Sequence, residues 1–441
     1  MDYLVEDQNT EKVNQKIDDI PGDKSISHRA AMCGALAYGT SQFKNVLFSE
    51  DCLNTIQIFR QMGVTIETKI ASNGNIGENE LRVNGVGLNG LKPPSEPFDV
   101  GNSGTSIRLL TGILAGQSFS SELIGDASIM KRPMKRVIDP LQAMGAQITG
   151  AYRQEDIYPP LKIQGNRPLR GTHITVPVAS AQIKSAILFA SLYAQGEAQI
   201  RMPQQCRDHS ERMLRLYGAE IKEKDHTLTL TKTALQAPKG VIQIPSDISS
   251  AAFFMVLGCI RPKTRLCLTK VGLNKTRDGI LHVLEKMGAK IRVQNVVMDV
   301  MEPYGDMVVE SSSLKNIQIG ADIIPDLIDE LPIIAVAALF AEGTCRVTGA
   351  RELRVKESDR IATIGQMIEA MGGHFLALDD GFEITGPSLP KPFQVASRGD
   401  HRIAMSAIIA AYGAQVKATV TDCDCINTSF PNFFSCLSPF K

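Results

Sequence analysis

A short pattern that ends a helix recurs five times along this chain of 441 residues. In each copy a Met-Gly or Tyr-Gly pair follows a helix-like stretch and precedes a small residue and an alternating, strand-like segment. Glycine directly after a helix is typical of a helix C-terminus, because glycine enters the left-handed backbone region freely. Recurrence at intervals of 70 to 84 residues indicates a structural repeat rather than one helix end. The glycines are Gly63, Gly145, Gly218, Gly288 and Gly372.

A second pattern precedes each of these glycines by 38 to 43 residues. It is a small or acidic residue that opens an Ala/Ile/Leu-rich segment, apolar nearly all round as buried helices are. Each repeat is therefore predicted to be a strand, a buried helix, a strand, an amphipathic helix and a strand. A sixth copy reaches the end of the chain before its glycine, so we expect the last repeat to be cut short. The segments open near Asp23, Gly104, Ser180, Ser246, Asp329 and Gly399.

Repeats of this length exceed those of solenoid proteins, which measure about 20 to 50 residues. Closed clusters of three repeats fit better and predict two α/β domains. A break in composition at residues 237–240 separates the third repeat from the fourth. Apolar residues make up 43% of the chain, enough to build two cores.

Composition excludes several classes of protein. Equal numbers of basic and acidic residues, no Trp and 5% aromatic residues argue against a nucleic-acid binder. The longest apolar stretches, residues 251–260 and 333–341, are too short to span a membrane, and the polar, acidic start is unlike a signal peptide. Nine scattered cysteines are typical of reduced, buried thiols rather than a zinc site. We therefore expect a cytoplasmic protein.

The starts of the predicted buried helices are polar and accompanied by cations. Unpaired N–H groups at a helix start carry partial positive charge and bind phosphate or carboxylate readily. Ordinary helix capping is the simpler explanation for single residues such as Ser246 and Ser249. The cations favour small ligands that carry phosphate and carboxylate, because the chain as a whole is neutral. They are Lys24, His28, Arg29, Arg108, Lys184, His401 and Arg402, with further clusters at residues 131–136 and 351–360.

Two carboxylates in these segments are candidates for acid–base chemistry. Asp329 precedes an apolar run and can be either the cap of that helix or a base. Glu357 lies among Lys and Arg residues, where it stays ionised and can accept a proton. If residues 351–360 form a helix, Lys356 and Arg360 are like-charged neighbours that need an anion between them. No Ser-His-Asp order, dinucleotide fingerprint or Walker loop is present.

In their order along the chain, these segments closely resemble the 5-enolpyruvylshikimate-3-phosphate (EPSP) synthase family. The resemblance covers almost the whole chain and implies a fold of two domains, an inside-out α/β barrel with three βαβαββ units around a pseudo-threefold axis in each. The matching motifs are residues 21–29 (PGDKSISHR), 101–105 (GNSGT), 125–128 (GDAS), 131–134 (KRPM), 180–182 (SAQ), 207–209 (RDH), 354–360 (RVKESDR), 400–405 (DHRIAM) and 428–431 (TSFP).

The resemblance also implies the division of the chain, because in that family the first strand segment returns to the second domain. Residues 1–20 and 244–441 are expected to form one domain and residues 21–243 the other, with the active site in the cleft between them. The first domain would contribute Asp329, Lys356, Glu357, Arg360 and Arg402, and the second Lys24, Gly104, Arg132, Gln182 and Arg207.

The reaction implied by the family is transfer of the enolpyruvyl group of phosphoenolpyruvate to the 5-hydroxyl of shikimate 3-phosphate, releasing phosphate, on the pathway to chorismate and the aromatic amino acids. It needs no metal or organic cofactor and suits a monomer. Asp329 would be the base, and either Lys24 or Glu357 would protonate the methylene carbon. The residues implied for shikimate 3-phosphate are Lys24, Ser25, Arg29, Ser180, Ala181, Gln182, Arg207, Asp329 and Lys356. Those implied for phosphoenolpyruvate are Lys24, Gly104, Arg132, Gln182, Arg360 and Arg402.

Two alternatives remain beside this prediction. A UDP-N-acetylglucosamine enolpyruvyl transferase shares fold and chemistry but uses a loop Cys, which residues 118–121 lack. A non-catalytic anion-binding scaffold predicts loss of the acid–base groups, which are present. Thr428 and Glu352 resemble a branch of the family whose members often tolerate glyphosate through an Ala beside the phosphoenolpyruvate pocket. This chain has Gly104 there, so we expect glyphosate to inhibit it.

Overall fold

The chain folds as two compact α/β units in the computed structural model, which describes residues 1–6, 8–71, 76–299 and 301–441. Residues 23–244 form one unit, which we call the continuous unit. Residues 1–22 and 245–441 form the other, which we call the split unit. The chain therefore passes from the split unit to the continuous unit once and returns once.

The described residues of the continuous unit form three sheets with one shared topology. An edge strand pairs parallel with its neighbour, and two further strands follow in antiparallel pairing. In pairing order the first sheet contains β14 (Leu235–Gln236) and β15 (Val241–Gln243), both on β3 (Ala37–Lys44), then β5 (Glu80–Val86) and β4 (Thr65–Lys69). The second contains β6 (Phe98–Asp99), β7 (Ser121–Ile124), β9 (Asp156–Gln164) and β8 (Gln147–Arg153). The third contains β10 (His173–Thr175), β11 (Glu197–Arg201), β13 (Thr227–Thr231) and β12 (Ile221–Lys224).

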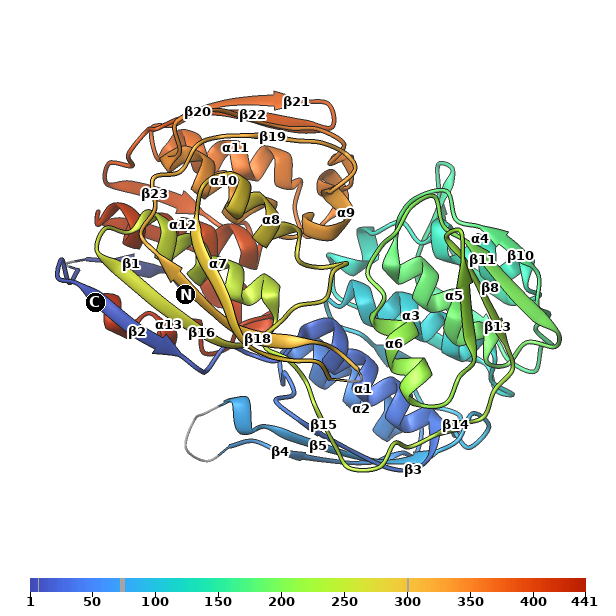
Figure 1. Ribbon diagram of the computed structural model, residues 1–441. Coiled ribbons are helices and arrows are strands. Elements are labelled where there is room, and N and C mark those ends of the chain that lie inside the picture. Colours follow the sequence, from blue (N-terminus) through green and yellow to red (C-terminus); the bar gives the residue numbers. More distant parts are fainter. Residues whose placement is uncertain (7, 72–75, 300) are drawn as a thin grey trace. The chain divides into compact units, whose positions relative to one another are not determined.

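Two kinds of helix alternate between these strands. The Ala/Ile/Leu-rich helices are buried almost throughout because no polar face is available for solvent. They are α1 (Lys24–Leu36), α3 (Gly104–Ala115) and α5 (Ala181–Ser191). The amphipathic helices are α2 (Glu50–Gln61), α4 (Lys135–Ala143) and α6 (His209–Leu216), and short turns are η1 (Ile76–Glu78) and η2 (Ile129–Lys131). Helices lie inside and sheets outside within the unit (Figure 1).

The described part of the split unit repeats this plan. Its first sheet contains β2 (Val13–Ile17), β16 (Thr264–Gly272), β18 (Tyr304–Glu310) and β17 (Lys290–Val297). Its second contains β19 (Gln318–Ile319), β20 (Gly343–Val347), β22 (Gly381–Gly386) and β21 (His374–Leu378). Its third contains β23 (Phe393–Ala396), β24 (Ala418–Thr421) and β1 (Tyr3–Val5).

The third sheet of the split unit is completed by the first strand of the chain. β23 and β24 pair parallel, as the first two strands of the other sheets do. β1 then pairs antiparallel with β24, the position that β18 and β22 occupy in their sheets. The sixth repeat is cut short as predicted, and a segment from the opposite end of the chain fills the place of its missing strand.

Three apolar helices pack together in the core of the split unit. They are α7 (Ile248–Ile260), α10 (Leu331–Phe340) and α12 (His401–Ala414). The remaining helices and turns are α8 (Gly279–Lys286), α9 (Ile324–Leu327), α11 (Arg360–Ala370), α13 (Phe433–Cys436), η3 (Arg351–Val355), η4 (Cys423–Thr428) and η5 (Ser438–Phe440). Among the described residues, no helix is long and apolar enough to cross a membrane.

The five repeat glycines end the helices as predicted. Each follows directly on the last residues of α2, α4, α6, α8 or α11, and each has a φ between +84° and +103°. Side chains are disfavoured in this left-handed region, so the glycine lets the chain leave the helix and start the next strand. The predicted repeat and the α/β fold class are confirmed.

Candidate active site

In the continuous unit, the first group of predicted site residues lies at the start of α1. The carboxylate of Asp23 caps this helix by accepting a hydrogen bond from the N–H of Ile26 (2.9 Å). Lys24 is the first helical residue, and its Nζ lies 2.6 Å from Oδ2 of Asp51 on α2. Asp51 is buried, whereas the Lys24 side chain keeps 24% of its surface exposed. The lysine is therefore held by an ion pair while part of its side chain stays exposed.

A second group surrounds the start of α3. Ser103 caps this helix through a bond from the N–H of Ser106 (3.1 Å), and Gly104 is its first residue. A Cβ on Gly104 would lie 2.8 Å from a terminal nitrogen of Arg132 and 2.9 Å from one of Arg108. Two guanidinium groups thus lie against the helix start, a combination of cations and helix N–H groups that favours an anion.

Gln182, near the start of α5, connects this helix to α3. Its Oε1 accepts a hydrogen bond from Arg108 (2.9 Å), and its Nε2 donates one to the hydroxyl of Thr105 (3.0 Å). Arg108 also donates to the carbonyl of Gly104 (3.1 Å). Gly104 and Gln182, both predicted for phosphoenolpyruvate, are therefore tied to one arginine, Arg108, which the predicted set had left out.

Arg29, which lies on the second turn of α1, is largely buried. It is 4% exposed and donates to the carbonyl of Ser25 (2.8 Å) and to the hydroxyls of Ser185 (2.8 Å) and Ser210 (2.6 Å). Burial lowers the pKa of its guanidinium below the ordinary value, although nearby Glu211 opposes the shift. Its bonds to three serines stiffen the segment that carries Lys24 and Ser25.

Two residues that the sequence placed among the ligand-facing cations do not act as such. Lys184 is 4% exposed, forms an ion pair with Glu211 and donates to the carbonyl of Cys206 (3.2 Å), so its charge is neutralised inside the unit. His28 is fully buried, and burial lowers its pKa to about 3, so it is a neutral ring. The prediction of a cation at His28 is wrong, because the sequence does not reveal how deeply that side of α1 is buried.

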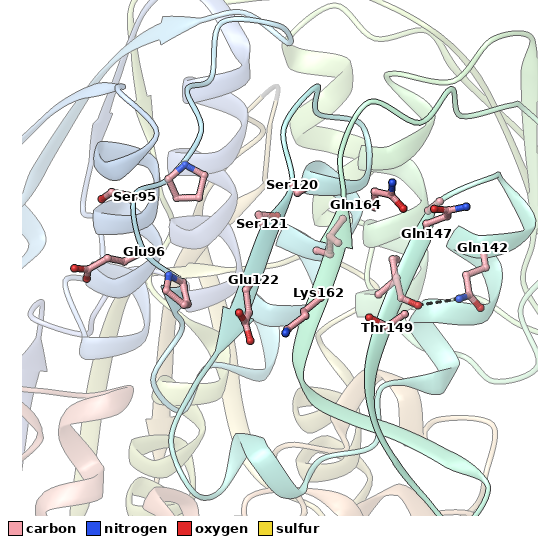
Figure 2. A pocket seen from close by; sticks show the side chains of 15 residues that line it. Ser95, Glu96, Ser120, Ser121, Glu122, Gln142, Gln147, Thr149, Lys162 and Gln164 are labelled. Carbon is pink, nitrogen blue, oxygen red and sulfur yellow. Dashed lines mark hydrogen bonds between the residues drawn. The ribbon is translucent and has the colours of Figure 1, made fainter.

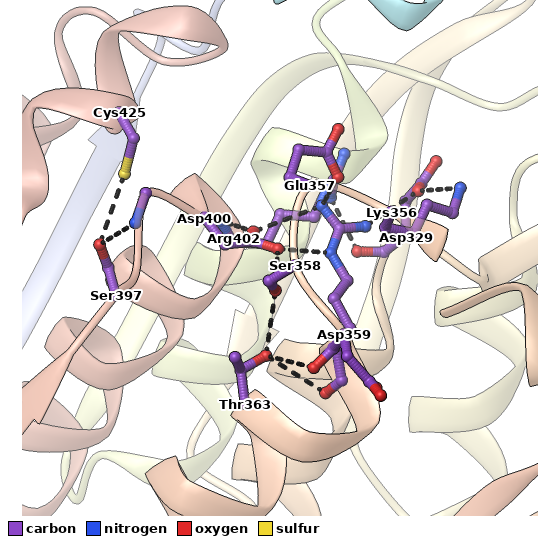
Figure 3. A network of polar contacts seen from close by, with 12 residues as sticks. Asp329, Lys356, Glu357, Ser358, Asp359, Thr363, Ser397, Asp400, Arg402 and Cys425 are labelled. Carbon is purple, nitrogen blue, oxygen red and sulfur yellow. Dashed lines mark hydrogen bonds and ion pairs between the residues drawn. The ribbon is translucent and has the colours of Figure 1, made fainter. Parts of the chain in front are cut away.

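In the split unit, three predicted cations converge on Asp329, two residues before the start of α10 (Figure 3). Its Oδ1 lies 3.1 Å from Nζ of Lys356 and 3.4 Å from a terminal nitrogen of Arg360. Its backbone carbonyl accepts a hydrogen bond from Arg402 (2.9 Å). Glu330, not Asp329, is the cap residue of α10, and the explanation of Asp329 as a helix cap is therefore not supported.

Arg360 is the buried centre of this cluster, with a side-chain exposure of 1%. Its Nε lies 2.9 Å from Asp400, and a terminal nitrogen lies 2.6 Å from Glu357. Burial alone would lower the pKa of Arg360, but Asp400, Glu357 and Asp329 together raise it above its ordinary value. Burial alone would raise the pKa of Asp400, and Arg360 more than offsets this and lowers it. Both groups are therefore held in their charged forms.

Lys356 and Arg360 are not neighbours on one helix. The turn η3 ends at Val355 and α11 begins at Arg360, so the residues between them follow a bend. Asp359 caps α11 by accepting bonds from two backbone N–H groups. The helical pairing considered for the sequence is wrong, yet the two cations do share an anion, the carboxylate of Asp329.

Several partners of the site could not be found in the sequence. Glu330 is fully buried, contacts the hydroxyl of Ser249, and lies 3.8 Å from Arg277 and 4.0 Å from Arg402. Glu330 stood out only as the neighbour of Asp329, whereas Arg277 carries no local signal. Asp51, the partner of Lys24, was missed for the same reason: its pairing depends on contact between two helices.

The continuous unit also has an open groove of about 800 Å³ beside its second sheet (Figure 2). It is lined by residues of the loop 94–97 and of β7, β8 and β9, among them Glu122 and Lys162. None of its lining residues belongs to the predicted substrate sets. In the described ranges, no three His, Cys, Asp or Glu side chains gather as a metal-binding group.

The two-unit architecture is also found in a solved enolpyruvyl transferase. The enolpyruvyl transferase NikO from Streptomyces tendae has the same fold, with a TM-score of 0.76 over 98% of this chain and 96% of that one, at 14% identity. The chain belongs to the EPSP synthase (3-phosphoshikimate 1-carboxyvinyltransferase) family, whose model matches residues 8–437.

Close relatives agree with this assignment. The chain is 48% identical to the 3-phosphoshikimate 1-carboxyvinyltransferase of Bacillus cytotoxicus, over 95% of this chain and 96% of the relative. It is equally similar, at 48%, to that of Bacillus pumilus, over 94% of each. The structure of EPSP synthase from Acinetobacter baumannii superimposes with a TM-score of 0.84 at 41% identity, over 99% of this chain and 97% of that one. The family predicted from the motifs is confirmed, and the protein is an enolpyruvyl-transferring enzyme.

Proposed function

We propose that the two groups of site residues act together on phosphoenolpyruvate and shikimate 3-phosphate. The enolpyruvyl group moves to the 5-hydroxyl of shikimate 3-phosphate and phosphate leaves, on the route to chorismate and the aromatic amino acids. The observation that carries this proposal is the meeting of Lys356, Arg360 and Arg402 at Asp329. A base surrounded by cations suits a hydroxyl that must be deprotonated beside bound phosphate and carboxylate.

The substrate contacts follow the chemistry of the two ligands. Shikimate 3-phosphate is assigned to hydroxyl, amide and cationic groups of both units, and phosphoenolpyruvate to the start of α3 with its guanidinium groups. The first set is Lys24, Ser25, Arg29, Ser180, Ala181, Gln182, Arg207, Asp329 and Lys356. The second is Lys24, Gly104, Arg132, Gln182, Arg360 and Arg402. Arg108 is added to the second set because it bridges Gly104 and Gln182.

The reaction proceeds by addition and elimination. A proton is added to the methylene carbon of phosphoenolpyruvate, and C2 becomes electrophilic. The 5-hydroxyl oxygen bonds to C2 while its proton passes to Asp329. The methyl group then gives a proton back to the group that supplied it. The double bond re-forms, and the C–O bond to phosphate breaks. Fixed cations stabilise the departing phosphate without reorganisation.

Lys24 is the better of the two candidates for the first proton transfer. It is paired with Asp51 at 2.6 Å, an arrangement that favours the protonated ammonium. Glu357 is paired with Arg360 at 2.6 Å, which favours the carboxylate, a form without a proton to give. We therefore assign Lys24 as the donor and leave Glu357 as a proton acceptor.

A phosphate-release assay tests the reaction and the base together. Release should require both substrates, and product analysis should find the enolpyruvyl ether at the 5-position. Asp329→Asn should lower kcat by about two to four decades, the usual contribution of a positioned proton acceptor. Asp322→Asn removes an exposed carboxylate of the same unit and should leave kcat unchanged. Turnover near normal in Asp329→Asn would contradict the assignment.

We also propose that the enzyme works as a cytoplasmic monomer. All nine cysteines are free thiols, which suits a reducing compartment. Light scattering during size-exclusion chromatography tests the monomer, for which the expected mass is 47.9 kDa.

A further inference from the structure

A chain of buried polar side chains joins three helices of the continuous unit. Nδ1 of His28 on α1 lies 2.8 Å from the hydroxyl of Thr55 on α2. That hydroxyl lies 2.7 Å from the hydroxyl of Ser106 on α3, which lies 2.7 Å from the hydroxyl of Ser103. Each of these four residues is at most 1% exposed, so the chain runs entirely through the interior.

The direction of the bonds follows from counting protons. The Ser106 hydroxyl donates to Ser103, so its contact with Thr55 must be one in which it accepts. The single hydroxyl proton of Thr55 is therefore used toward Ser106, a shorter contact than the 3.3 Å to the carbonyl of Asp51. Thr55 must then accept from His28, which requires the ring to carry its proton on Nδ1.

His28 is suited to this place because it is uncharged. Burial lowers its pKa to about 3, the largest influence on the ring, so it remains neutral at physiological pH. Its Nε2 has no hydrogen-bond partner among the described residues. An unprotonated ring nitrogen loses less by burial than an N–H group would, which agrees with the proton on Nδ1.

The series of hydrogen bonds that begins at His28 ends at Ser103, the residue that caps α3. Ser103 accepts bonds from both the hydroxyl and the N–H of Ser106, and the next residue is Gly104. The guanidinium nitrogens of Arg132 and Arg108 lie within 3 Å of where a Cβ of Gly104 would stand. A small movement of this helix start would therefore alter the spacing between its N–H groups and both arginines.

We propose that His28 is a positioning residue for phosphoenolpyruvate, which through Thr55 and Ser106 fixes the start of α3. The inference rests on the placement of phosphoenolpyruvate at Gly104 proposed above. His28 touches neither substrate in this scheme. A merely structural role would change stability alone, whereas a positioning role must change one KM selectively.

The test compares His28→Leu with His28→Asn in the complete enzyme. Leu cannot donate to Thr55, and the KM for phosphoenolpyruvate should rise roughly five- to thirtyfold, as expected when a buried hydrogen bond supporting a helix cap is lost. The KM for shikimate 3-phosphate should change less than twofold. The Asn side chain presents an amide N–H close to the position of Nδ1 and should restore the KM to within about threefold of the natural enzyme.

Thr55→Val and Ser106→Ala interrupt the same series of hydrogen bonds at other positions. They test the positioning role if His28→Leu does not fold. Each should raise the KM for phosphoenolpyruvate selectively, and the double variant should be no worse than the single ones, because one chain is broken once. The matched control is Thr111→Val, since the buried hydroxyl of Thr111 on α3 bonds to the carbonyl of Ile107 within its own helix. This control should leave the ratio of the two KM values unchanged.

Two results would overturn the proposal in different ways. In the first, Gly104→Ala raises the KM for phosphoenolpyruvate, but the folded variants His28→Leu, Thr55→Val and Ser106→Ala leave both KM values unchanged or alter them equally. Only the positioning role of His28 then fails. If Gly104→Ala also leaves the KM for phosphoenolpyruvate unchanged, the placement of this substrate at α3 fails and the positioning role fails with it.

Discussion

The three residues proposed for acid–base roles each lie beside a group of opposite charge, and these neighbours favour the charged form of each residue. Lys24 is held by Asp51, and Glu357 by Arg360, each at 2.6 Å. Asp329 faces two cations, Lys356 and Arg360. These pairings support the proposed roles of Lys24 as a proton donor and of Asp329 and Glu357 as proton acceptors.

The pH dependence of kcat distinguishes the two candidate acids. If Lys24 gives the first proton, kcat falls on the alkaline side as the lysine loses its proton, and Glu357→Gln should keep this alkaline limb. Lys24→Met should abolish the limb and lower kcat by about two decades or more. Loss of the alkaline limb in Glu357→Gln, with the limb retained in Lys24→Met, would assign the proton to Glu357 instead.

Gly104→Ala should weaken inhibition by glyphosate more than binding of phosphoenolpyruvate. The new methyl would lie 2.8 Å from Arg132 and 2.9 Å from Arg108, too close for either guanidinium to stay in place. Because close-packed sites respond to a single methyl, the longer inhibitor should be affected more than the compact substrate. Inhibition titrations of both proteins measure this. A natural enzyme that resists glyphosate, or equal inhibition of both proteins, would show that Gly104 is not the discriminating position.

His28 makes the stability of the continuous unit depend on pH. Its pKa is about 3 in the folded chain, against an ordinary value of 6.5. Between these values the unfolded chain binds a proton that the folded chain does not, so stability falls as the pH is lowered through this window. From pH 7 to pH 5 the loss attributable to His28 is about 2 kcal/mol. Urea titrations of His28→Asn should show a correspondingly smaller loss; an identical loss would mean that His28 is protonated when folded.

At the scale of helices and strands, the glycine that ends each amphipathic helix is the most repetitive feature of the chain. Gly218 is a clear example, because its φ is +91° and, its two chain neighbours aside, no described residue has an atom within 4 Å of where a Cβ would be. Only the backbone conformation, and not a steric clash, then requires a glycine.

Gly218→Ala should therefore destabilise the protein by roughly 1 kcal/mol, the cost of a side chain in the left-handed region. Gly218→Asn is the matched variant and should cost less, because Asn enters that region more readily. Urea midpoints measure both. Equal stability of the Ala and Asn variants would show that the helix end tolerates another backbone conformation.

Helices and strands were more predictable from the sequence than the pairs of side chains that contact one another between them. The repeat glycines and the buried helices are local patterns, so their positions follow from periodicity and from the backbone freedom of glycine. The pairing of Lys24 with Asp51, or of Glu330 with Ser249, depends on which helices meet, and no local signal records that. The charge of His28 was wrongly predicted for the same reason, since it is decided by burial.

At the scale of the whole molecule, the residues proposed for shikimate 3-phosphate come from both units of the chain. Arg207 and Lys24 belong to the continuous unit, and Asp329 and Lys356 to the split unit. A dianionic phosphate that contacts cations of both units favours whichever arrangement brings them together.

We therefore expect shikimate 3-phosphate to compact the protein in solution. Small-angle scattering should record a smaller radius of gyration on addition of this substrate, and inorganic phosphate at the same concentration should have a weaker effect. Lys356→Met should lose the compaction while keeping the fold of each unit. Scattering curves that do not change with saturating shikimate 3-phosphate would contradict the proposal.

The position of β1 has a consequence for how the protein is made. The ribosome releases residues 1–22 first, yet β1 pairs with β24, one of the last strands to be synthesised. The continuous unit, residues 23–244, is complete while much of the split unit is still to be translated. Domains generally fold as units during synthesis, so we expect the continuous unit to be folded in the nascent chain before β24 is synthesised. Until then, β1 cannot form its pairing with β24.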